Sequence, residues 1–414
     1  MDRADVVVVG AGTIGGWASY FAKSSGASRV VCLEGHVAGY GASSRAAGIV
    51  RAQGGTPAAV QLGLWSIDFY RSQAERLAID SGFRALGYLL LATTDDDVEA
   101  GRQRVAMQRE AGLHDVSWLE PQEVASLVTS LAPDVHRGGS YRAGDGAIDP
   151  PRNVGAYLVA LQRSGVELRE RTPCVALHTR QAGGGHVIEV ETPTGRIVTE
   201  RVILTGGPML ADVGALLGTR IPVGGVRHQV AVTEAHPAFD PGGAPMVFDV
   251  AAGLYWRPEE GGLLFGMSNP DEPPGTARSV DWAYLDEMRR RLARFVPVTR
   301  GLELRKVWAA TIDYTPDHLP ILGPALDAGR EPIPGVTVAS AGGHGMMWGP
   351  AVARAATDLA LHADTAVVDT AGLGLDRFDE HGRSRLAADP IALPFPTDAA
   401  QASGDGAVSR GAGR

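Results

Sequence analysis

The chain of 414 residues has little of what holds small secreted proteins together or anchors proteins in membranes. It contains two cysteines, Cys32 and Cys174, which are too few for a disulfide framework and fit a reducing cytosol. No run of apolar residues approaches the roughly 20 that a membrane-spanning helix needs. The first strand is expected from Val6, which leaves no room for a secretion signal before it. The sequence therefore predicts a cytoplasmic protein with no membrane span, and it predicts no metal site.

Acidic residues outnumber basic ones, 47 to 38. The formal net charge is −9, which gives a nucleic-acid partner no electrostatic support. Lysine is nearly absent, with only Lys23 and Lys306 present, so arginine supplies almost all of the positive charge. The length suffices for about two or three domains, each with its own core.

What the sequence does contain is a complete dinucleotide-binding pattern at its start. A buried run, Val6–Val9, leads into Gly10-x-Gly12-x-x-Gly15, and a second apolar run ends at Glu34, about 20 residues further on. The three glycines permit a tight turn, a close approach of pyrophosphate and the packing of helix on strand. The helix N-terminus favours phosphate, and the acid is placed to accept hydrogen bonds from ribose. The pattern predicts an α/β fold with a Rossmann-type domain, and an ordinary glycine-rich turn is the weaker interpretation.

Hydrophobic periodicity predicts further elements along the chain. Helices are expected over 57–81, 95–111, 121–128, 150–163, 280–295 and 350–362. Strands are expected over 88–92, as several short pieces within 166–204, and over 201–207, 224–234, 253–266, 304–308 and 336–339. The segments 224–234 and 253–266 alternate apolar and polar residues, which is typical of a half-buried antiparallel sheet.

The order of these elements predicts a discontinuous nucleotide domain. The strand at 201–207 runs into a glycine turn, and the last unit is again strand, glycine turn and helix, so both are expected to join the first sheet. The nucleotide-binding domain is then formed by residues 1–82, 146–222 and 315–390. A second domain, for substrate, comprises 83–145 and 223–314. Residues beyond about Pro394 are small and polar, and residues 391–414 are expected to form a disordered tail.

Three sequence blocks resemble a known family. They are GlyAlaGlyThrIleGlyGly (10–16), GlyAlaSerSerArgAlaAlaGlyIle (41–49), and ThrProAspHisLeuProIleLeuGly (315–323) with GlyGlyHisGlyMetMetTrpGlyPro (342–350). In this order they resemble the D-amino-acid oxidase superfamily of FAD-dependent amine and amino-acid oxidoreductases, which includes glycine oxidase, sarcosine oxidase and dimethylglycine dehydrogenase. The resemblance implies a Rossmann-type FAD-binding domain with an inserted antiparallel-sheet substrate domain.

The resemblance and the glycine pattern together predict the residues that contact FAD. Small residues in the second block let backbone approach the ring system, and its hydroxyls and arginine can donate to pyrophosphate or ribityl oxygens. The helix opened by 342–349 would face the pyrimidine edge of the flavin and stabilise negative charge there. The predicted contacts are Gly10, Gly12, Thr13, Ile14, Gly15, Glu34, Gly41, Ser43, Ser44, Arg45, Ala47, Gly48, Val175, Gly206, Gly207, Gly343, His344, Gly345, Met346 and Met347.

Departures from the family pattern sharpen this expectation. Ala310 stands where sarcosine oxidase has its flavin-linking cysteine, and Arg45 where dimethylglycine dehydrogenase has a histidine, which predicts non-covalent FAD. Leu264 takes the place of the oxygen-activating lysine of sarcosine oxidase, and Lys306 has no reason to lie near flavin N5. The electron acceptor is therefore left open between O2 and another acceptor.

The substrate-binding positions also depart from the family. Ile312 and Met347 replace an arginine and a lysine that hold carboxylates in relatives. Arg51 is either a clamp for a carboxylate or a solvated loop residue. A set of large residues favours a bulky or apolar amine, although each alone is more typical of core packing. The set is His228, Met267, Trp308, Met346, Met347 and Trp348.

The predicted chemistry is oxidation of a C–N bond of an amine or N-substituted amino acid, with hydride transfer to flavin N5 and release of an imine. His228 or His344 is a candidate base, although His344 in a glycine-rich turn can equally be structural. Tyr255 and Arg257 share one face of a strand, which looks either into the site or beneath the helix at 280–295. Alternatives are a flavin-dependent 2-hydroxy acid dehydrogenase, one subunit of a hetero-oligomeric flavin dehydrogenase, or a catalytically silent flavoprotein.

Overall fold

The computed structural model describes residues 2–182, 185–239 and 243–392. A six-stranded sheet forms its centre, in the order β10-β3-β2-β14-β21-β20. The first five strands run parallel, and β20 is antiparallel to β21. The strands are β2 (Val6–Val9), β3 (Val30–Leu33), β10 (Glu167–Arg169), β14 (Val202–Leu204), β20 (Ile321–Leu326) and β21 (Pro332–Ser340). The sheet thus draws on both ends and the middle of the chain, as the sequence predicts.

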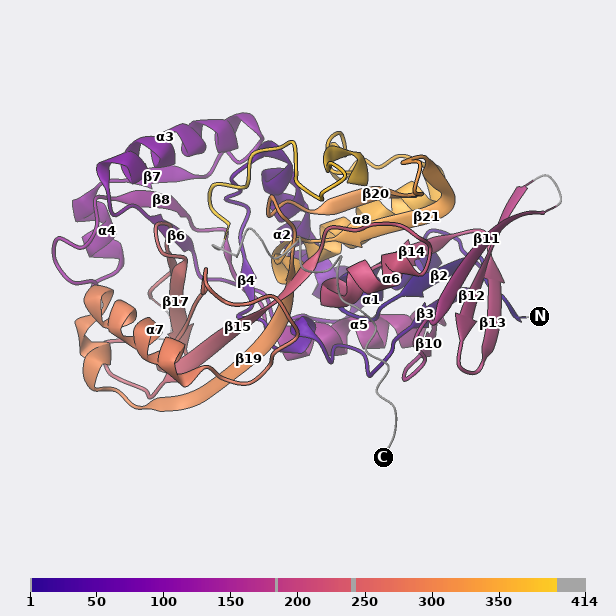
Figure 1. Cartoon of the computed structure of the whole chain (residues 1–414). Helices are drawn as coiled ribbons and strands as arrows, with labels where there is room; N and C mark the ends of the chain where they lie inside the picture. The colour runs from indigo at the N-terminus through magenta and orange to yellow at the C-terminus, as the bar shows by residue number, and fades with distance from the viewer. Residues whose placement is uncertain (1, 183–184, 240–242, 393–414) are drawn as a thin grey trace.

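Both faces of this sheet are covered, which explains why β2 consists of four valines. Val6 and Val8 pack against helices, whereas Val7 and Val9 pack against a second, four-stranded sheet. The helices are α1 (Thr13–Ser24), α2 (Pro57–Leu77), α5 (Pro150–Ser164) and α8 (Gly345–His362). The covering sheet consists of β1 (Asp2–Arg3), β11 (Ala176–Ala182), β12 (Gly185–Thr192) and β13 (Gly195–Thr199) and lies at one end of the molecule in Figure 1. The short helix α6 (Leu210–Ala215) contributes to the same hydrophobic core as this sheet.

A larger sheet of eight strands lies at the opposite end of the molecule (Figure 1), in the order β19-β15-β18-β17-β16-β6-β8-β7. Its strands are β6 (Tyr88–Leu91), β7 (Ser117–Leu119), β8 (Gly139–Arg142), β15 (Gly224–Thr233), β16 (Met246–Asp249), β17 (Leu254–Glu259), β18 (Gly262–Met267) and β19 (Leu304–Tyr314). Its helices are α3 (Asp95–Glu110), α4 (Pro121–Leu127) and α7 (Trp282–Phe295). The strands β4 (Ile49–Val50), β5 (Arg84–Ala85) and β9 (Gly146–Ala147) form a separate short sheet.

Two expectations for the large sheet need correction. The sheet is antiparallel except for β6 and β16, which pair in parallel. Its strands were expected to be half-buried, but β17 and β18 are buried almost throughout. The reason is that the core against α7 covers one face, and a second apolar cluster, which includes Ala47 of the nucleotide-binding region, covers the other.

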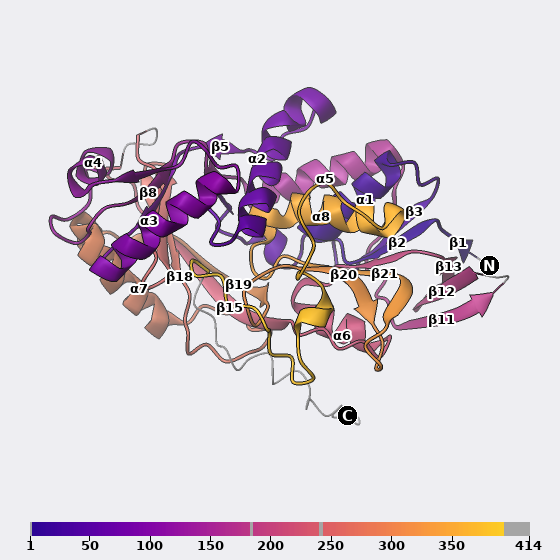
Figure 2. The ribbon, with the colours of Figure 1, turned by 90° about the horizontal axis from the view of Figure 1, so that it is seen from above.

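The two ends of the chain meet at α1 and α8, which lie side by side in Figure 2. The hydroxyl of Thr357 on α8 donates to the carbonyl of Ala18 on α1 at 3.2 Å. A Cβ on Gly349 would lie 2.9 Å from the Thr13 side chain, so glycine permits this close packing. The dinucleotide loop at the start of the chain and the last glycine turn are thereby held next to each other.

The last helix begins earlier than expected. It starts at Gly345, so that Pro350, predicted to open the helix, lies inside it. Proline has no N–H for the carbonyl four residues before it. That carbonyl, of Met346, instead accepts a hydrogen bond from the Tyr70 hydroxyl at 2.9 Å. A tertiary contact therefore compensates for the proline.

The tail expected over 391–414 includes Ile391, which is buried in the apolar cluster of the large sheet. Residues 393–414 lie outside the described residues. Among the described residues, no helix is both long enough and apolar enough to cross a membrane.

Candidate active site

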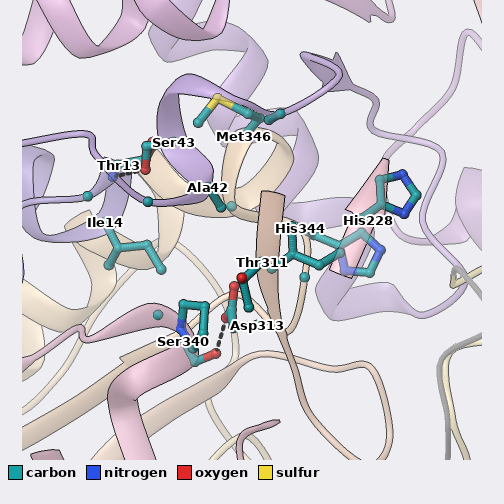
Figure 3. A pocket seen from close by; sticks show the side chains of 18 of the residues that line it. Thr13, Ile14, Ala42, Ser43, His228, Thr311, Asp313, Ser340, His344 and Met346 are labelled. Atoms are coloured by element: carbon teal, nitrogen blue, oxygen red, sulfur yellow. Dashed lines mark hydrogen bonds between the residues drawn. The ribbon is translucent and has the colours of Figure 1, made fainter. Parts of the chain in front are cut away.

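One cavity runs from the glycine loop after β2 to the large sheet, and Figure 3 shows part of its wall. Most residues predicted from the sequence line it. These are Gly10, Gly12, Thr13, Ile14, Glu34, Gly41, Ser43, Ala47, Gly48, Arg51, Gly206, Gly207, His228, Tyr255, Gly343, His344, Gly345, Met346 and Met347. Gly10, Glu34, Gly206 and Gly343 follow strands of the six-stranded sheet at their carboxyl ends, whereas His228 and Tyr255 lie on strands of the eight-stranded sheet.

The glycine loop has the geometry that its sequence predicts. Gly10 adopts φ 101°, a left-handed conformation that other residues rarely adopt. A Cβ on Gly15 would lie 1.7 Å from the carbonyl oxygen of Gly10, so only glycine lets α1 approach β2. The N-cap of α1, Gly12, carries no capping side chain, and its first turn has no acidic residue. This end of the cavity therefore presents helix N–H groups and a partial positive charge.

Glu34 follows β3 at the same edge of the sheet. Its Oε2 accepts a hydrogen bond from the Ala11 N–H at 2.9 Å, and its Oε1 accepts one from the His36 N–H at 2.8 Å. These bonds hold the carboxylate beside the glycine loop, where a ribose would lie.

The second sequence block supplies the wall opposite the loop. The Thr13 N–H donates to the Ser43 hydroxyl oxygen at 2.9 Å, which ties the block to the start of α1 (Figure 3). A Cβ added to Gly41, Gly207 or Gly345 would meet no protein atom within 4 Å. Since all three line the cavity, the space beside them is available to a ligand rather than filled by protein.

The glycine turn before α8 brings a second helix N-terminus to the cavity. Its N-cap residue, His344, makes no capping bond with its side chain, and the first turn of α8 has no acidic residue. The His344 Nδ1 lies 3.1 Å from the Gly342 carbonyl oxygen, and its ring centroid lies 4.2 Å from that of Trp348. Burial lowers the pKa of His344 to about 3, so its imidazole is neutral. These contacts favour the structural interpretation of this histidine.

Four predicted contacts with the cofactor lie outside the lining residues. Gly15 acts through packing, as described above, and the Ser44 hydroxyl oxygen accepts a hydrogen bond from Arg45 Nη1 at 3.4 Å. Arg45 turns back on its own loop, where Nη1 donates to the Gly41 carbonyl at 3.1 Å and the guanidinium lies 5.3 Å from the Tyr40 ring centroid. Val175 is 47% exposed, and its N–H pairs with the Glu191 carbonyl of β12. Among the described residues, these four do not line the cavity.

Arg51 is buried, which excludes the solvated-loop interpretation. It is 3% exposed and lines the cavity. Nη2 donates to the Ile391 carbonyl at 3.2 Å, and Nη1 donates to the Gln53 carbonyl. Within the described residues its Nε has no hydrogen-bond partner, and no carboxylate lies within ion-pair distance of it. A buried cation without an anion is costly, so this guanidinium is suited to a ligand that brings one.

His228 and Tyr255 form a pair in the wall of the same cavity. His228 Nε2 lies 2.7 Å from the Tyr255 hydroxyl, and both residues line the cavity. Burial lowers the pKa of His228 to about 4 and raises that of Tyr255, so both are neutral near pH 7. In the described part of the chain His228 Nδ1 has no hydrogen-bond partner.

The face of β17 that carries Tyr255 looks into the cavity and not beneath α7. The Tyr255 side chain points into the cavity, whereas Trp256 packs against Phe295 of α7 on the other face. Arg257, on the cavity side, donates to the Ala47 carbonyl through Nε at 3.4 Å and Nη2 at 3.3 Å. It thereby supports the second sequence block from behind.

The set of large residues divides between cavity and core. His228, Met346 and Met347 line the cavity. Met267 packs in the core beneath α7, and Trp348 is buried among the helices of the nucleotide-binding region. Trp308 donates its indole N–H to the Arg45 carbonyl at 2.8 Å, which is a supporting role. Met267, Trp308 and Trp348 therefore follow the core-packing interpretation, and the other three residues line the cavity.

Several lining residues were missed by sequence reasoning. Asp313, near the end of β19, is half-buried in the cavity wall, and its Oδ2 accepts a hydrogen bond from the Ser340 hydroxyl at 2.8 Å (Figure 3). Burial raises the pKa of Asp313, and no charged neighbour offsets this among the described residues. Its position in the sequence could have indicated this, because Asp313 lies two residues before the ThrProAsp block of the family pattern. The other missed residues include His36, Tyr40, Tyr88, Met209, Phe248, Thr276, Arg278, Thr311 and Ile391.

Comparison with known proteins places this geometry in a family. A family model described as FAD dependent oxidoreductase matches residues 5–359. This chain belongs to the family of FAD-dependent oxidoreductases. Glycine oxidase of Geobacillus kaustophilus is 30% identical over 333 residues, which cover 78% of this flavoprotein and 84% of that enzyme.

A solved structure and one further relative support the assignment. The crystal structure of glycine oxidase from Geobacillus kaustophilus superimposes with a TM-score of 0.77 at 28% identity, covering 92% of this flavoprotein and 100% of that chain. Mitochondrial dimethylglycine dehydrogenase of Rattus norvegicus is 27% identical over 381 residues, which are 88% of this chain and 43% of that enzyme. This flavoprotein thus spans less than half the length of that relative.

FAD is the cofactor of this family, and the cavity fits it. The dinucleotide loop and Glu34 suit the adenosine and pyrophosphate, because they offer helix N–H groups and a fixed carboxylate. The free space at Gly41, Gly207 and Gly345 leaves room for the rest of the molecule. The N-terminus of α8 suits the flavin ring, since it can stabilise negative charge on the pyrimidine edge.

Proposed function

We propose that this flavoprotein oxidises a C–N bond of an amine or N-substituted amino acid that carries an apolar substituent, giving an imine. Bound FAD would accept the hydride of this reaction at N5. The observation that carries the proposal is the buried Arg51, without a counterion in the described residues, in the same cavity wall as the neutral His228–Tyr255 pair.

Arg51 is proposed to bind the substrate carboxylate. Its fork of N–H donors matches a carboxylate in geometry, and a burial of 97% would strengthen the interaction by excluding water. Its two bonds to carbonyl groups hold the guanidinium in place while leaving Nε unpaired. Positioning of this kind supports catalysis because it fixes the reacting carbon relative to the cofactor.

His228 is proposed to accept a proton from the substrate amine. An amine must be unprotonated to give up a hydride from its α-carbon, and a histidine that is neutral near pH 7 can remove that proton. Its unpartnered Nδ1 is the atom assigned to this role, while Tyr255 fixes the ring through Nε2. His344 is the weaker candidate, since its ring is already engaged with Gly342 and Trp348.

The apolar substituent is proposed from the rest of the wall. Phe248, Ile312 and Met347 bring apolar side chains to the cavity. Ile312 and Met347 stand where relatives have charged carboxylate ligands, so Arg51 is left as the proposed anchor. A buried arginine together with these apolar side chains suits a substrate with one carboxylate and a hydrophobic group.

FAD is proposed to be held without a covalent bond. Cys32 is buried on β3 with its pKa raised to about 12, and Cys174 has its pKa raised to about 12 as well. Neither thiol belongs to the cavity wall. Acid precipitation tests this point: flavin should remain in the supernatant, and a yellow pellet would contradict the proposal.

The electron acceptor is proposed to be O2 or another oxidant that does not depend on a lysine near the flavin. Leu264 packs in the apolar cluster beside Tyr255, and Lys306 is exposed on β19. No lysine of the described residues lines the cavity. The cytoplasmic location stays a prediction from the sequence.

A bleaching screen tests the proposed function. The purified holoprotein is mixed anaerobically with N-methylated amino acids, cyclic amines and 2-hydroxy acids, and the visible absorbance of the flavin is followed. At least one amine with an apolar substituent should bleach the flavin. Bleaching by 2-hydroxy acids alone, or by no member of the amine panel, would contradict the proposal.

A further inference from the structure

The end of the described chain runs into the substrate end of the cavity. Ile391 lines the cavity and is 1% exposed, although it falls within the tail that is expected from the sequence to be disordered. It belongs to the same apolar cluster as Tyr88, Phe248 and Tyr255, which come from three strands of the large sheet. A residue more than 300 positions from the dinucleotide loop therefore completes the wall.

The segment that carries Ile391 is fixed by specific bonds. Asp389 Oδ1 accepts a hydrogen bond from the Ile391 N–H at 3.0 Å, and the Asp389 N–H donates to the Asp317 carbonyl at 3.0 Å. Asp317 belongs to the ThrProAsp block, and its carboxylate forms a buried ion pair with Arg377 at 2.7 Å. A Cβ on Gly55 would lie 1.9 Å from Asp389 Oδ1, which shows how closely this turn packs against the loop after Arg51.

The same segment contacts the proposed carboxylate anchor. Arg51 Nη2 donates to the Ile391 carbonyl at 3.2 Å. The backbone of residue 391 thus orients the guanidinium, and its side chain occupies the adjoining apolar space. Substrate carboxylate and substrate side chain would both be positioned by this one residue.

We propose that the segment 387–392 is a wall of the substrate site and that Ile391 limits the size of the apolar substituent that the site accepts. The inference rests on the proposed function, because it takes Arg51 as the carboxylate anchor. Its physical basis is close packing: an added methylene group finds room only if a wall atom is removed.

The test measures ligand size without turnover. Straight-chain carboxylates from acetate to octanoate carry no amine to oxidise, and their binding to the holoprotein is read from the visible flavin spectrum. Ile391→Ala should tighten binding of the longer acids relative to acetate, by about three- to fourfold for each methylene that the new space admits. Ile391→Phe should shift the preference towards acetate, and Ile391→Val should lie between the wild type and Ile391→Ala.

A matched control lies directly before this segment. Leu386 is 41% exposed, so Leu386→Ala should leave the length profile unchanged. A profile that is the same in the wild type and all Ile391 variants would overturn the inference, as would a failure of every carboxylate to bind. Thermal unfolding of each variant identifies any that fails to fold, and Ile391→Val keeps the test valid if Ile391→Ala does.

The two proposals fail in different ways. If the length profile shifts but no amine bleaches the flavin, the wall is upheld and the proposed reaction is wrong. If amines bleach the flavin but the profile does not shift, the reaction stands and the role of Ile391 is wrong.

Discussion

The Tyr255 hydroxyl lies 2.7 Å from His228 Nε2, although the two residues sit on strands that are not neighbours. Strand β18 runs between them and places Gly266 opposite Tyr255. A Cβ on Gly266 would lie 2.1 Å from the Tyr255 hydroxyl oxygen. The phenol ring of Tyr255 therefore crosses β18 over Gly266. The pair can form because Gly266 has no side chain to occupy this space.

Gly266→Ala should separate the pair. The added methyl group must displace the Tyr255 ring, which we expect to lower the free energy of unfolding by about 1–3 kcal/mol, as in other overpacked cores. Urea unfolding measures this effect. Gly301→Ala is the matched control, because a Cβ there meets no atom within 4 Å, and it should leave stability nearly unchanged. Equal effects of the two substitutions would show that the gap at Gly266 has no structural role.

His228→Ala should slow the anaerobic reduction of the flavin by about 100-fold, the lower range of loss for a general base. Because the pKa of His228 is lowered to about 4, the wild-type rate between pH 6 and 9 should follow the ionisation of the substrate amine and not that of the histidine. Stopped-flow absorbance across this pH range measures both effects. His178→Ala, an exposed histidine on β11, serves as control. An unchanged reduction rate in His228→Ala would remove the residue from the mechanism.

Arg51→Gln should weaken binding of substrates that carry a carboxylate. Loss of a hydrogen bond to a charged group costs about 1.5–3 kcal/mol, which corresponds to about a 10- to 150-fold increase in KM. Amines without a carboxylate should be affected much less, so the ratio of the two KM values is the informative quantity. Arg76→Gln, on the exposed end of α2, should change neither. The anchor role is wrong if both classes of substrate lose affinity equally.

Asp313→Asn should change how stability depends on pH. Burial raises the pKa of Asp313 in the folded protein above its ordinary value of 3.8, so between these two values the folded state holds a proton that the unfolded chain has released. Its contribution to stability is thus complete below pH 3.8 and is lost as pH rises through the folded pKa. Asparagine has no such proton and keeps an oxygen for the Ser340 hydroxyl.

The expected signature is a stability difference that grows with pH. The free energy of unfolding of Asp313→Asn minus that of the wild type should rise from pH 4 and level off above the folded pKa of Asp313, as measured by urea unfolding at each pH. The exposed Asp286→Asn on α7 should show no such rise. A difference that stays constant with pH would mean that Asp313 ionises as freely in the folded protein as in the unfolded chain.

The nucleotide-binding half was predictable because its determinants are local. Gly10 needs a left-handed backbone, Gly15 needs the absence of a Cβ, and Glu34 follows a short buried strand. Each requirement is met within about one strand–helix unit, so the residue order alone indicates it. Arg51 and Tyr255 were also named from the sequence, but their burial and orientation stayed open between two interpretations.

Local patterns failed where distant residues decide the outcome. Pro350 was expected to begin a helix, but the Tyr70 hydroxyl satisfies the carbonyl that proline leaves unpaired, so the helix begins five residues earlier. The strands of the large sheet were expected to have one polar face, but the nucleotide-binding region covers that face. No pattern near the chain end marks Ile391 as buried.

The sequence by itself therefore determined the dinucleotide fold, its glycine loop and the family, since these depend on backbone conformations that only particular residues permit. Only the tertiary structure decided the substrate end of the cavity. There the 2.7 Å contact of His228 with Tyr255 depends on a gap in a third strand, and Arg51 is oriented by the carbonyl of a residue 340 positions away. Such contacts are fixed by packing between distant segments, and adjacent residues carry no signal of them.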